Sequence, residues 1–278
     1  MNFRPKKRWT CCLSCLLFFS GYSYSQQLVG RILNEDNQSI AYASVGIKSK
    51  KAGIVADSSG KFKLTLPEFV KDNDSVIISS IGFQSLRMTV KTAAAQSEFI
   101  LKPISKDLPE VSLNSFLHTV TVGSSSQDFT FYRGWFERKT GGEIGKIVSI
   151  PHKKYKLDKI FFKADNSCDT CWVRLHIRKM NGDDPGDELL TDNIIAPFSK
   201  LNYSDYPAFD LSEYNVVLTE KRIFIGFEVL NCTNVESKIS SLSFIGTETG
   251  DYLYKSYANS PWEKGLYYNI DISMFLKF

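Results

Sequence analysis

The chain has 278 residues, of which 43% are hydrophobic and 13% are aromatic, enough to build buried cores in one large or two ordinary domains. It carries 34 basic and 30 acidic side chains, for a formal net charge of +4. After residue 26 no apolar stretch is long enough to cross a bilayer as a helix, so the composition excludes a protein with several transmembrane helices.

The first 25 residues predict a secretory signal peptide. The basic residues come first and are Arg4, Lys6, Lys7 and Arg8. An apolar run over residues 9–19 follows, and Ser23 and Ser25 then give the small-residue pattern that a signal peptidase reads. The run is shorter than the roughly 20 residues of a membrane-spanning helix, which favours cleavage after Ser25 over a retained anchor. We therefore expect an exported protein that resides in the periplasm, on the outer-membrane surface or in the medium.

Removal of this segment changes both the charge and the cysteine count. The 34 basic residues less these four leave 30, equal to the 30 acidic ones, so the mature chain has no net charge. Nucleic acid is therefore not an expected partner, because phosphate binding needs a concentrated basic surface. Cys168, Cys171 and Cys232 remain, and an odd number in an exported chain allows one internal disulfide and one further thiol.

Residues 27–103 predict a small β-sandwich of seven short strands without a helix. The strands are expected at 28–33, 41–47, 53–56, 61–66, 76–80, 86–90 and 99–101. In the fourth of them Phe62 and Leu64 alternate with Lys61 and Lys63, the period of a strand with one buried face. The preceding segment 57–60 (Asp-Ser-Ser-Gly) is typical of a turn.

Four segments of this region carry a resemblance to a known family. They are Val29-Gly30-Arg31-Ile32, Ile40-Ala41-Tyr42-Ala43-Ser44-Val45, Asp57-Ser58-Ser59-Gly60-Lys61-Phe62 and Ile81-Gly82-Phe83. Together they resemble the carboxypeptidase-regulatory-like domain, a transthyretin-like sandwich, although Lys51-Ala52-Gly53 stands where the family usually has Gly-Thr. The resemblance implies an exported or outer-membrane protein of a Gram-negative bacterium, such as a TonB-dependent receptor. Too few residues follow for the plug and long barrel of such a receptor, so the resemblance carries the domain and not the transporter.

Residues 104–134 are expected to form a linker and a strand that leads into a second domain, with greatest flexibility at 123–127 (Gly-Ser-Ser-Ser-Gln). Residues 135–278 are again rich in strand patterns and predict a jelly-roll-type β-sandwich of eight to ten strands, with a turn at 182–187. The fold class is therefore all-β, with two sandwiches in series. Carbohydrate-binding modules share the jelly-roll architecture, but architecture alone does not determine function.

The motifs of the common hydrolases are absent from the sequence. None of His118, His152 and His176 is followed three residues later by an acid, and no His-Glu-x-x-His is present, which argues against a zinc carboxypeptidase. No Gly-x-Ser-x-Gly elbow occurs either. Cys168 and Cys171 have the spacing of a redox pair, but they run into a strand and not into the helix that lowers a thiol pKa. The chain is therefore expected not to be an enzyme.

Three groups of residues are candidates for sites. An aromatic platform for a ligand is expected from Tyr252, Tyr254, Tyr257, Trp262 and Trp135, with core packing as the alternative. A structural calcium ion is a candidate ligand of Asp183, Asp184 and Asp187, with a solvated turn as the favoured alternative; no other cofactor is expected. Cys168, Cys171 and Cys232 are the disulfide candidates, without a choice of pairing.

The sequence thus predicts an exported, non-catalytic binding or scaffolding protein of the bacterial cell envelope, with a glycan or an envelope protein as its partner. One alternative is an accessory subunit of an outer-membrane assembly of the TonB-dependent type. A second alternative is a glycosidase, because its two carboxylates require no sequence motif.

Overall fold

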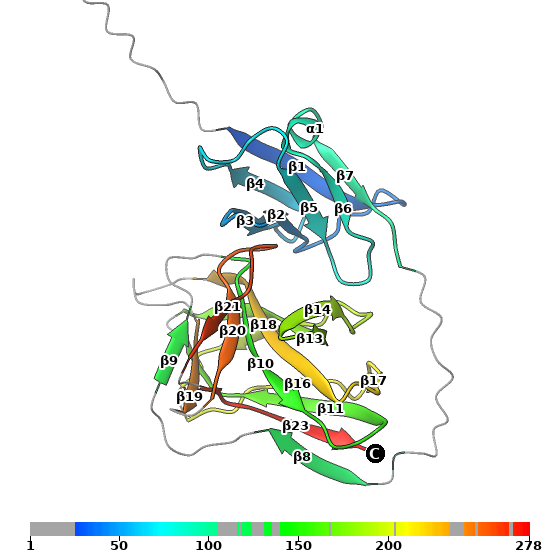
Figure 1. The fold of residues 1–278 in the computed structure, drawn as a ribbon, viewed down its shortest axis with the longest axis vertical. Coiled ribbons are helices and arrows are strands. Elements are labelled where there is room, and N and C mark those ends of the chain that lie inside the picture. Colours follow the sequence, from blue (N-terminus) through cyan, green and yellow to red (C-terminus); the bar gives the residue numbers. More distant parts are fainter. Residues whose placement is uncertain are drawn as a thin grey trace, which may run out of the picture.

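A computed structural model describes residues 26–104, 116, 118–123, 131–134, 140–166, 168–202, 204–233, 242–247, 250–266 and 269–278, and it is almost entirely β-structure (Figure 1). The predicted signal peptide, residues 124–127 of the flexible stretch, and Trp135 lie outside these residues. In the described part of the chain, no helix has the length and apolarity needed to cross a membrane.

The N-terminal domain is a sandwich of two sheets, which confirms the predicted seven-stranded architecture. One sheet has the order β4-β1-β7 and consists of β4 (Lys61–Thr65), β1 (Gln27–Asn34) and β7 (Glu98–Leu101). The other has the order β3-β2-β5-β6 and consists of β3 (Gly53–Val55), β2 (Ser44–Ile47), β5 (Ser75–Ser79) and β6 (Leu86–Thr89). Along β4 buried and exposed residues alternate as the sequence predicted, which places Phe62 and Leu64 in the core.

One short helix, α1 (Val90–Ala94), interrupts the region that was expected to contain only strands. Thr89 ends β6 and caps this helix, because its hydroxyl oxygen accepts a hydrogen bond from the Thr92 backbone N–H at 3.1 Å. The strand expected at 86–90 is therefore one residue shorter. Val90 and Ala93 bury the inner side of α1 against the core, so the helix closes one end of the sandwich.

The C-terminal domain is a larger β-sandwich, built from three sheets. The seven-stranded sheet contains β10 (Glu143–Ser149), β13 (Thr170–Asn181), β14 (Asp184–Glu188), β15 (Ile195–Ser199), β18 (Arg222–Thr233), β20 (Tyr252–Lys255) and β21 (Glu263–Gly265). The five-stranded sheet contains β8 (Thr119–Gly123), β11 (Tyr155–Phe162), β16 (Ala208–Asp210), β17 (Val217–Leu218) and β23 (Ile272–Lys277). The four-stranded sheet contains β9 (Phe131–Gly134), β12 (Ala164–Asn166), β19 (Leu242–Thr247) and β22 (Asn269–Ile270).

This domain has more strands than the eight to ten that were expected. Several of them, such as β17 and β22, have only two residues and pair at the margins of longer strands, so their patterns are too short to recognise in sequence.

The turn expected at 182–187 is shorter in the structure than the sequence predicted. Only residues 182 and 183 connect β13 to β14, because Asp184 already pairs with Asn181.

An array of phenylalanine rings fills the centre of the C-terminal core. Its members are Phe162, Phe198, Phe209, Phe227 and Phe244. The rings of Phe162 and Phe227 have centroids 4.6 Å apart, and those of Phe227 and Phe244 lie 5.3 Å apart. Because these rings come from strands of all three sheets, the array joins the sheets into one core.

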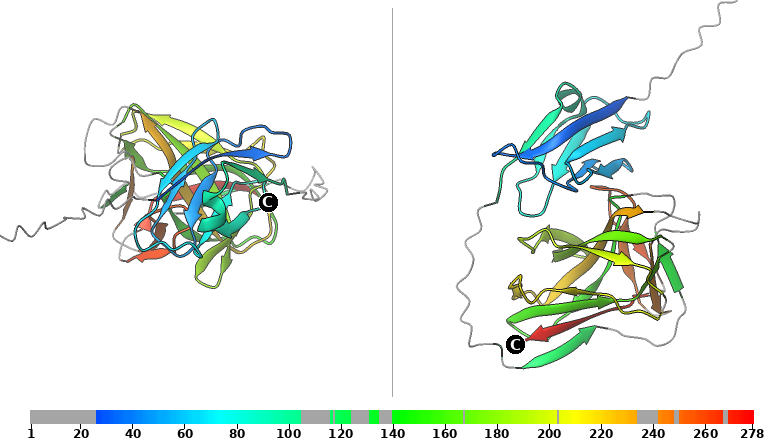
Figure 2. Two further views of the ribbon diagram at one scale, coloured as in Figure 1. Left: turned by 90° about the horizontal axis from the view of Figure 1, so that it is seen from above. Right: turned by 180° about the vertical axis from the view of Figure 1, so that it is seen from behind.

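The N-terminal sandwich rests on one end of the C-terminal sandwich (Figures 1 and 2). Ile81, in the loop between β5 and β6, is 9% exposed and packs with the core of the C-terminal domain and not with its own. Asn259 donates a side-chain hydrogen bond of 3.1 Å to the Ile77 carbonyl, and Lys51 forms an ion pair of 3.1 Å with Glu263. The two sandwiches are therefore joined by apolar, hydrogen-bonded and charged contacts.

Glycine residues allow the backbones of the two domains to approach closely. A Cβ atom on Gly46 would lie 2.1 Å from the Ala258 carbonyl oxygen, and one on Gly53 would lie 2.5 Å from the same atom. Both distances are below any normal contact and involve backbone atoms, so a side chain at either position would push the domains apart.

Candidate functional site

A row of charged side chains crosses the seven-stranded sheet at the domain interface. Arg174 on β13 lies opposite Glu228 on β18, Glu228 lies opposite Glu143 on β10, and Glu143 lies opposite Lys255 on β20. Residues directly opposite one another in a sheet project to the same face. His176 and Arg178 follow Arg174 at intervals of two along β13 and therefore join the same face.

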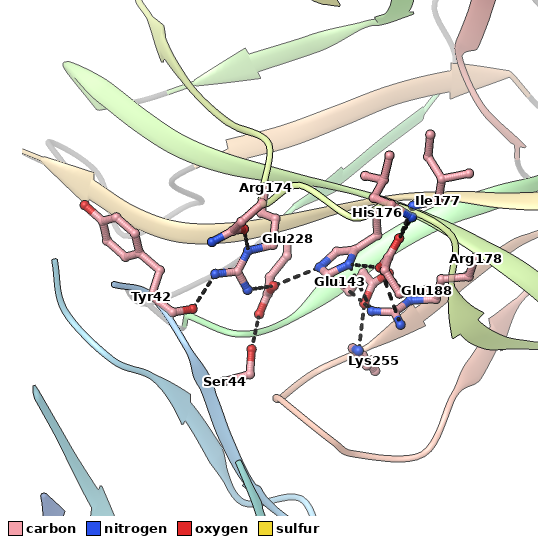
Figure 3. A network of polar contacts seen from close by, with 12 residues as sticks. Tyr42, Ser44, Glu143, Arg174, His176, Ile177, Arg178, Glu188, Glu228 and Lys255 are labelled. Atoms are coloured by element: carbon pink, nitrogen blue, oxygen red, sulfur yellow. Dashed lines mark hydrogen bonds and ion pairs between the residues drawn. The ribbon is translucent and has the colours of Figure 1, made fainter. Parts of the chain in front are cut away.

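The carboxylates of this network bind the cations closely (Figure 3). Glu228 accepts hydrogen bonds from Arg174 at 2.8 Å and contacts the His176 Nε2 atom at 2.9 Å. Glu143 accepts two bonds of 3.0 Å from the Arg178 guanidinium and lies 2.7 Å from the Lys255 ammonium nitrogen. We call these residues, together with Glu188, the charged network.

Glu188, on the edge strand β14, completes the charged network. Its Oε2 atom lies 2.6 Å from His176 Nδ1, and its Oε1 atom accepts a bond of 2.9 Å from the Ile177 backbone N–H. The imidazole of His176 is therefore held between two carboxylates, one at each ring nitrogen. Gly226 makes room for this arrangement, because a Cβ atom there would lie 2.6 Å from the Glu143 carboxylate.

Burial and charge act in opposite directions on the pKa values of the network. Burial alone would raise the pKa of Glu228, but Arg174 and His176 lower it to about 2. Burial would likewise raise the pKa of Glu143, and Arg178, His176 and Lys255 hold it well below its usual range. The pKa of His176 is raised despite burial, because Glu143 and Glu188 favour the charged imidazolium. The network is therefore a set of ionised groups that neutralise one another.

The N-terminal domain supplies part of the cover of this network. The Ser44 hydroxyl donates a hydrogen bond of 3.2 Å to Glu228, and Arg174 donates a short hydrogen bond to the Tyr42 carbonyl. Arg174 and Glu228 are only 1% and 2% exposed as a result. The charges of one domain are thus satisfied in part by the backbone and side chains of the other.

A pocket of about 710 Å³ lies between the domains beside the network. The N-terminal domain contributes Ser44, Ser79, Ser80, Ile81, Gly82, Phe83, Ser85 and Ile104 to its wall. The C-terminal domain contributes four basic and four acidic side chains to the wall, and these are Arg174, His176, Arg178, Lys255, Asp187, Glu188, Asp192 and Glu228. Ser80 is 8% exposed, and its hydroxyl has no hydrogen-bond partner among the described residues.

Of the aromatic residues expected to form a ligand platform, Tyr252 and Tyr254 lie side by side, with ring centroids 5.8 Å apart. The position of Tyr252 differs from the expected ligand contact. Its side chain is only 5% exposed and packs in the C-terminal core, because this part of β20 is buried. Tyr254 is half-buried, and its hydroxyl donates to Glu263 at 3.3 Å. Trp262 packs edge-on against Phe224, with the Lys255 ammonium nitrogen 4.9 Å from its ring centroid. Tyr257 is half-buried in the segment 255–260 that meets the N-terminal domain, so this stretch serves the interface.

The three aspartates proposed as calcium ligands do not converge. Asp183 is fully exposed at the hairpin turn and lies 3.9 Å from Arg222, whereas Asp187 lines the interdomain pocket. Asp184 begins β14. Within the described residues, the ligand atoms of these aspartates form no group of three, and the one such group that is found consists of Cys168, Cys171 and Cys232.

The charged network was not recognised in the sequence. Arg174, His176 and Arg178 alternate with apolar residues along a strand that was correctly expected, and such a basic face on a central strand is the available signal. Its acidic partners Glu143 and Glu228 lie far away along the chain. Only the sheet register brings the two sets together.

Comparisons with known proteins identify the N-terminal domain. Residues 28–113 match the family model of the CarboxypepD_reg-like domain. No curated protein matches the chain. A solved structure that includes the cysteine protease and lectin-like domains of Cwp84, a surface layer associated protein of Clostridium difficile, aligns with a TM-score of 0.38 and 11% sequence identity. The alignment covers 91% of this chain and 59% of that one, and a similarity this low assigns no function. The N-terminal part of the chain, at residues 28–113, is therefore a CarboxypepD_reg-like domain.

Proposed function

We propose that the protein is an exported, non-catalytic binding protein of the bacterial cell envelope that holds a glycan in the pocket between its two β-sandwiches. The observation that carries this proposal is the pocket itself, because both domains contribute to its wall. Its volume of about 710 Å³ falls within the range of roughly 300–1,000 Å³ that is common for sites of small ligands.

The charge of the pocket wall supports a neutral ligand. Its four basic side chains are matched by four acidic ones, and the buried members of the charged network already bind one another. A strongly charged ligand would have to displace one of these internal partners. The remaining wall offers hydroxyl and amide groups at Ser79, Ser85, Thr191 and Asn259, which suit the hydroxyl groups of a sugar.

The ionisation of the network supports binding over hydrolysis. A glycosidase needs one carboxylic acid with a raised pKa to protonate the leaving group. The pKa values of Glu143, Glu188 and Glu228 are all lowered, because cationic neighbours outweigh the burial that would raise them. Each of these groups also lies within 3 Å of a cationic or imidazole partner. They therefore suit a structural role in shaping the pocket.

The test is a glycan array probed with the mature chain, residues 26–278, followed by titration calorimetry with the best ligand. In a Ser85→Trp variant the indole would fill the pocket from an exposed position, and we expect at least a tenfold loss of affinity. Ser58→Trp is the matched control, because Ser58 is exposed in the turn before β4 and does not line the pocket. Binding that survives Ser85→Trp would refute the pocket as the site.

Two other outcomes would replace the proposal. No glycan signal together with co-purification of an outer-membrane protein would favour an accessory subunit of an envelope assembly. Release of new reducing ends from a bound glycan would identify a glycosidase.

A further inference from the structure

Three cysteines meet at one end of the seven-stranded sheet, away from the residues that line the pocket. The Sγ atoms of Cys168, Cys171 and Cys232 all lie within 4.8 Å of one another, and those of Cys168 and Cys171 are 2.7 Å apart. Cys168 precedes β13, Cys171 lies in it, and Cys232 lies near the end of β18. In the described part of the chain no other group of potential metal ligands is as compact.

Cys171 takes part in two of the three possible pairings, those with Cys168 and with Cys232. It is three residues from Cys168, and it lies directly opposite Cys232 in the antiparallel ladder between β13 and β18. A disulfide requires Cβ atoms about 4 Å apart, a separation that directly opposed residues of an antiparallel pair approach. Either pairing therefore demands only small movements of the side chains.

The three positions differ in their exposure. Cys171 is fully buried and Cys168 is 6% exposed, whereas Cys232 is only partly buried at the margin of the core. A pairing of Cys168 with Cys171 leaves the most accessible sulfur as a thiol, and a pairing of Cys171 with Cys232 leaves a buried one. The choice of pairing thus decides whether a reagent from solvent can react with the site.

The surroundings of the thiols raise their pKa values. Burial raises the pKa of the Cys168 thiol to about 11, and hydrogen bonding to Cys232 together with burial raises that of Cys171 further. In thiol–disulfide exchange, the thiol with the highest pKa is the poorest leaving group. Cys171 is therefore suited to remain in the disulfide while its partner changes.

We propose that Cys168, Cys171 and Cys232 form a thiol–disulfide exchange site, in which Cys171 changes its partner between Cys168 and Cys232 and thereby controls modification of Cys232 by a low-molecular-weight disulfide. This inference uses residues separate from the pocket and does not depend on the proposed function. Its consequence for the fold is that the Cys171–Cys232 bond would tie β13 to β18, the two strands that carry Arg174 and Glu228.

Each step balances. A low-molecular-weight disulfide oxidises Cys168 and Cys171, so one protein disulfide forms and two small thiols are released. The Cys232 thiolate then attacks Cys171 Sγ; the Cys171–Cys232 bond forms, the Cys168–Cys171 bond breaks, and Cys168 leaves as a thiolate that takes up the proton Cys232 lost. Alternatively, Cys232 attacks a second small disulfide, which gives one mixed disulfide and one released thiol.

The experiment is peptide mapping of the mature chain, reduced and then equilibrated in glutathione buffers of increasing oxidising strength, with alkylation and mass spectrometry. We expect both internal disulfides in the wild type, together with at most one glutathione per chain, located on Cys232. A single internal pairing at every redox poise, or an adduct on Cys168, would overturn the proposal. So would one equivalent of zinc retained by the reduced protein with all three thiols protected from alkylation.

Two variants separate the steps. Cys168→Ser should trap the Cys171–Cys232 bond and lower the glutathione adduct at least tenfold. Cys232→Ser should leave the Cys168–Cys171 bond and abolish the adduct. An unchanged adduct in Cys168→Ser would show that the pairing does not control access to Cys232, and the wild-type map remains decisive if either variant folds poorly.

Discussion

The two β-sandwiches of this protein bury different kinds of side chain. The core of the N-terminal domain is apolar, with residues such as Leu28, Ile32 and Phe99 between its sheets. The C-terminal domain has an equally apolar centre, but all the buried charged side chains of the described residues belong to it. The difference indicates that one face of the seven-stranded sheet of the C-terminal domain is completed by the N-terminal domain.

Residues from the family segments of the N-terminal domain cover this face of the C-terminal sheet. Ile81 and Gly82 of the Ile-Gly-Phe segment enter the C-terminal domain, where Ile81 joins the core and Gly82 approaches the Thr191 carbonyl. Ser44 and the Tyr42 carbonyl, from the segment before and at the start of β2, bind the charged network. In this chain the domain therefore acts as one wall of a shared site.

The largest expected effect comes from removing a charge from the network. Glu143→Gln removes the carboxylate from Arg178 and Lys255, whose side chains are only 17% and 13% exposed, so we expect the free energy of unfolding to fall by about 3–5 kcal/mol. Urea unfolding followed by circular dichroism measures it. The matched control is Asp251→Asn, which removes an exposed ion pair with Lys264 and should cost less than about 1 kcal/mol. Equal effects would show that the network contributes no more than a surface pair.

The second prediction concerns the apolar contact between the domains. Ile81→Ala removes a side chain of the N-terminal domain from the C-terminal core, and we expect a loss of about 2 kcal/mol and a larger radius of gyration in X-ray scattering. Ile100→Ala, at a position that is 49% exposed, should change stability by less than about 0.5 kcal/mol and leave the scattering unchanged. If both variants behave alike, Ile81 does not hold the domains together.

The third prediction tests the close approach of the backbones. In Gly46→Ala the new Cβ would meet the Ala258 carbonyl at 2.1 Å, so the domains must separate locally, at a cost of about 1–3 kcal/mol. Hydrogen–deuterium exchange should become faster in residues 255–260, which contact the N-terminal domain, and remain unchanged in β23 on the far sheet. Unaltered exchange in 255–260 would contradict the tight docking.

The fourth prediction is a dependence of stability on pH. The raised pKa of His176 adds stability that is complete below the ordinary imidazole value of 6.5 and is lost as the pH rises through the raised pKa. The lowered pKa of Glu228 adds stability that is present above its ordinary value of 4.5 and is lost as the pH falls toward about 2. The free energy of unfolding should therefore be largest between about pH 5 and 6.5. His176→Gln should remove the fall in this free energy on the alkaline side. An identical alkaline slope in the variant would assign that decline to another group.

Much of the fold could be predicted from the sequence, because it depends on local patterns of residues. The alternation of Phe62 and Leu64 with lysines located β4, and the Asp57–Gly60 turn formed as expected, with the Asp57 carboxylate accepting backbone bonds from Ser59 and Lys61. The helix α1 was missed because its five residues are too few for a helical period. Strands of two or three residues in the C-terminal domain were missed for the same reason.

The site was less accessible to sequence reasoning. From the sequence, the Tyr252–Trp262 group was as consistent with core packing as with a sugar platform, and in the structure Tyr252 packs in the core and Trp262 packs on Phe224. The aspartates of the β13–β14 hairpin lie close together in sequence and were considered as calcium ligands. The hairpin has a two-residue turn, and among the described residues their carboxylates form no group of three. Cys168 and Cys171 were recognised as a pair, and the position of Cys232 opposite Cys171 followed only from the strand register.

By itself the sequence determined the all-β class, the seven-stranded N-terminal sandwich and its family, because alternation, turn residues and short motifs are local and survive without tertiary context. The tertiary structure decided how the two sandwiches meet, which charges become neighbours and where a pocket opens between them. These features depend on the register of β10, β13, β18 and β20 and on the contact between domains. Register and docking are set by the fit of surfaces far apart along the chain, which no local pattern encodes.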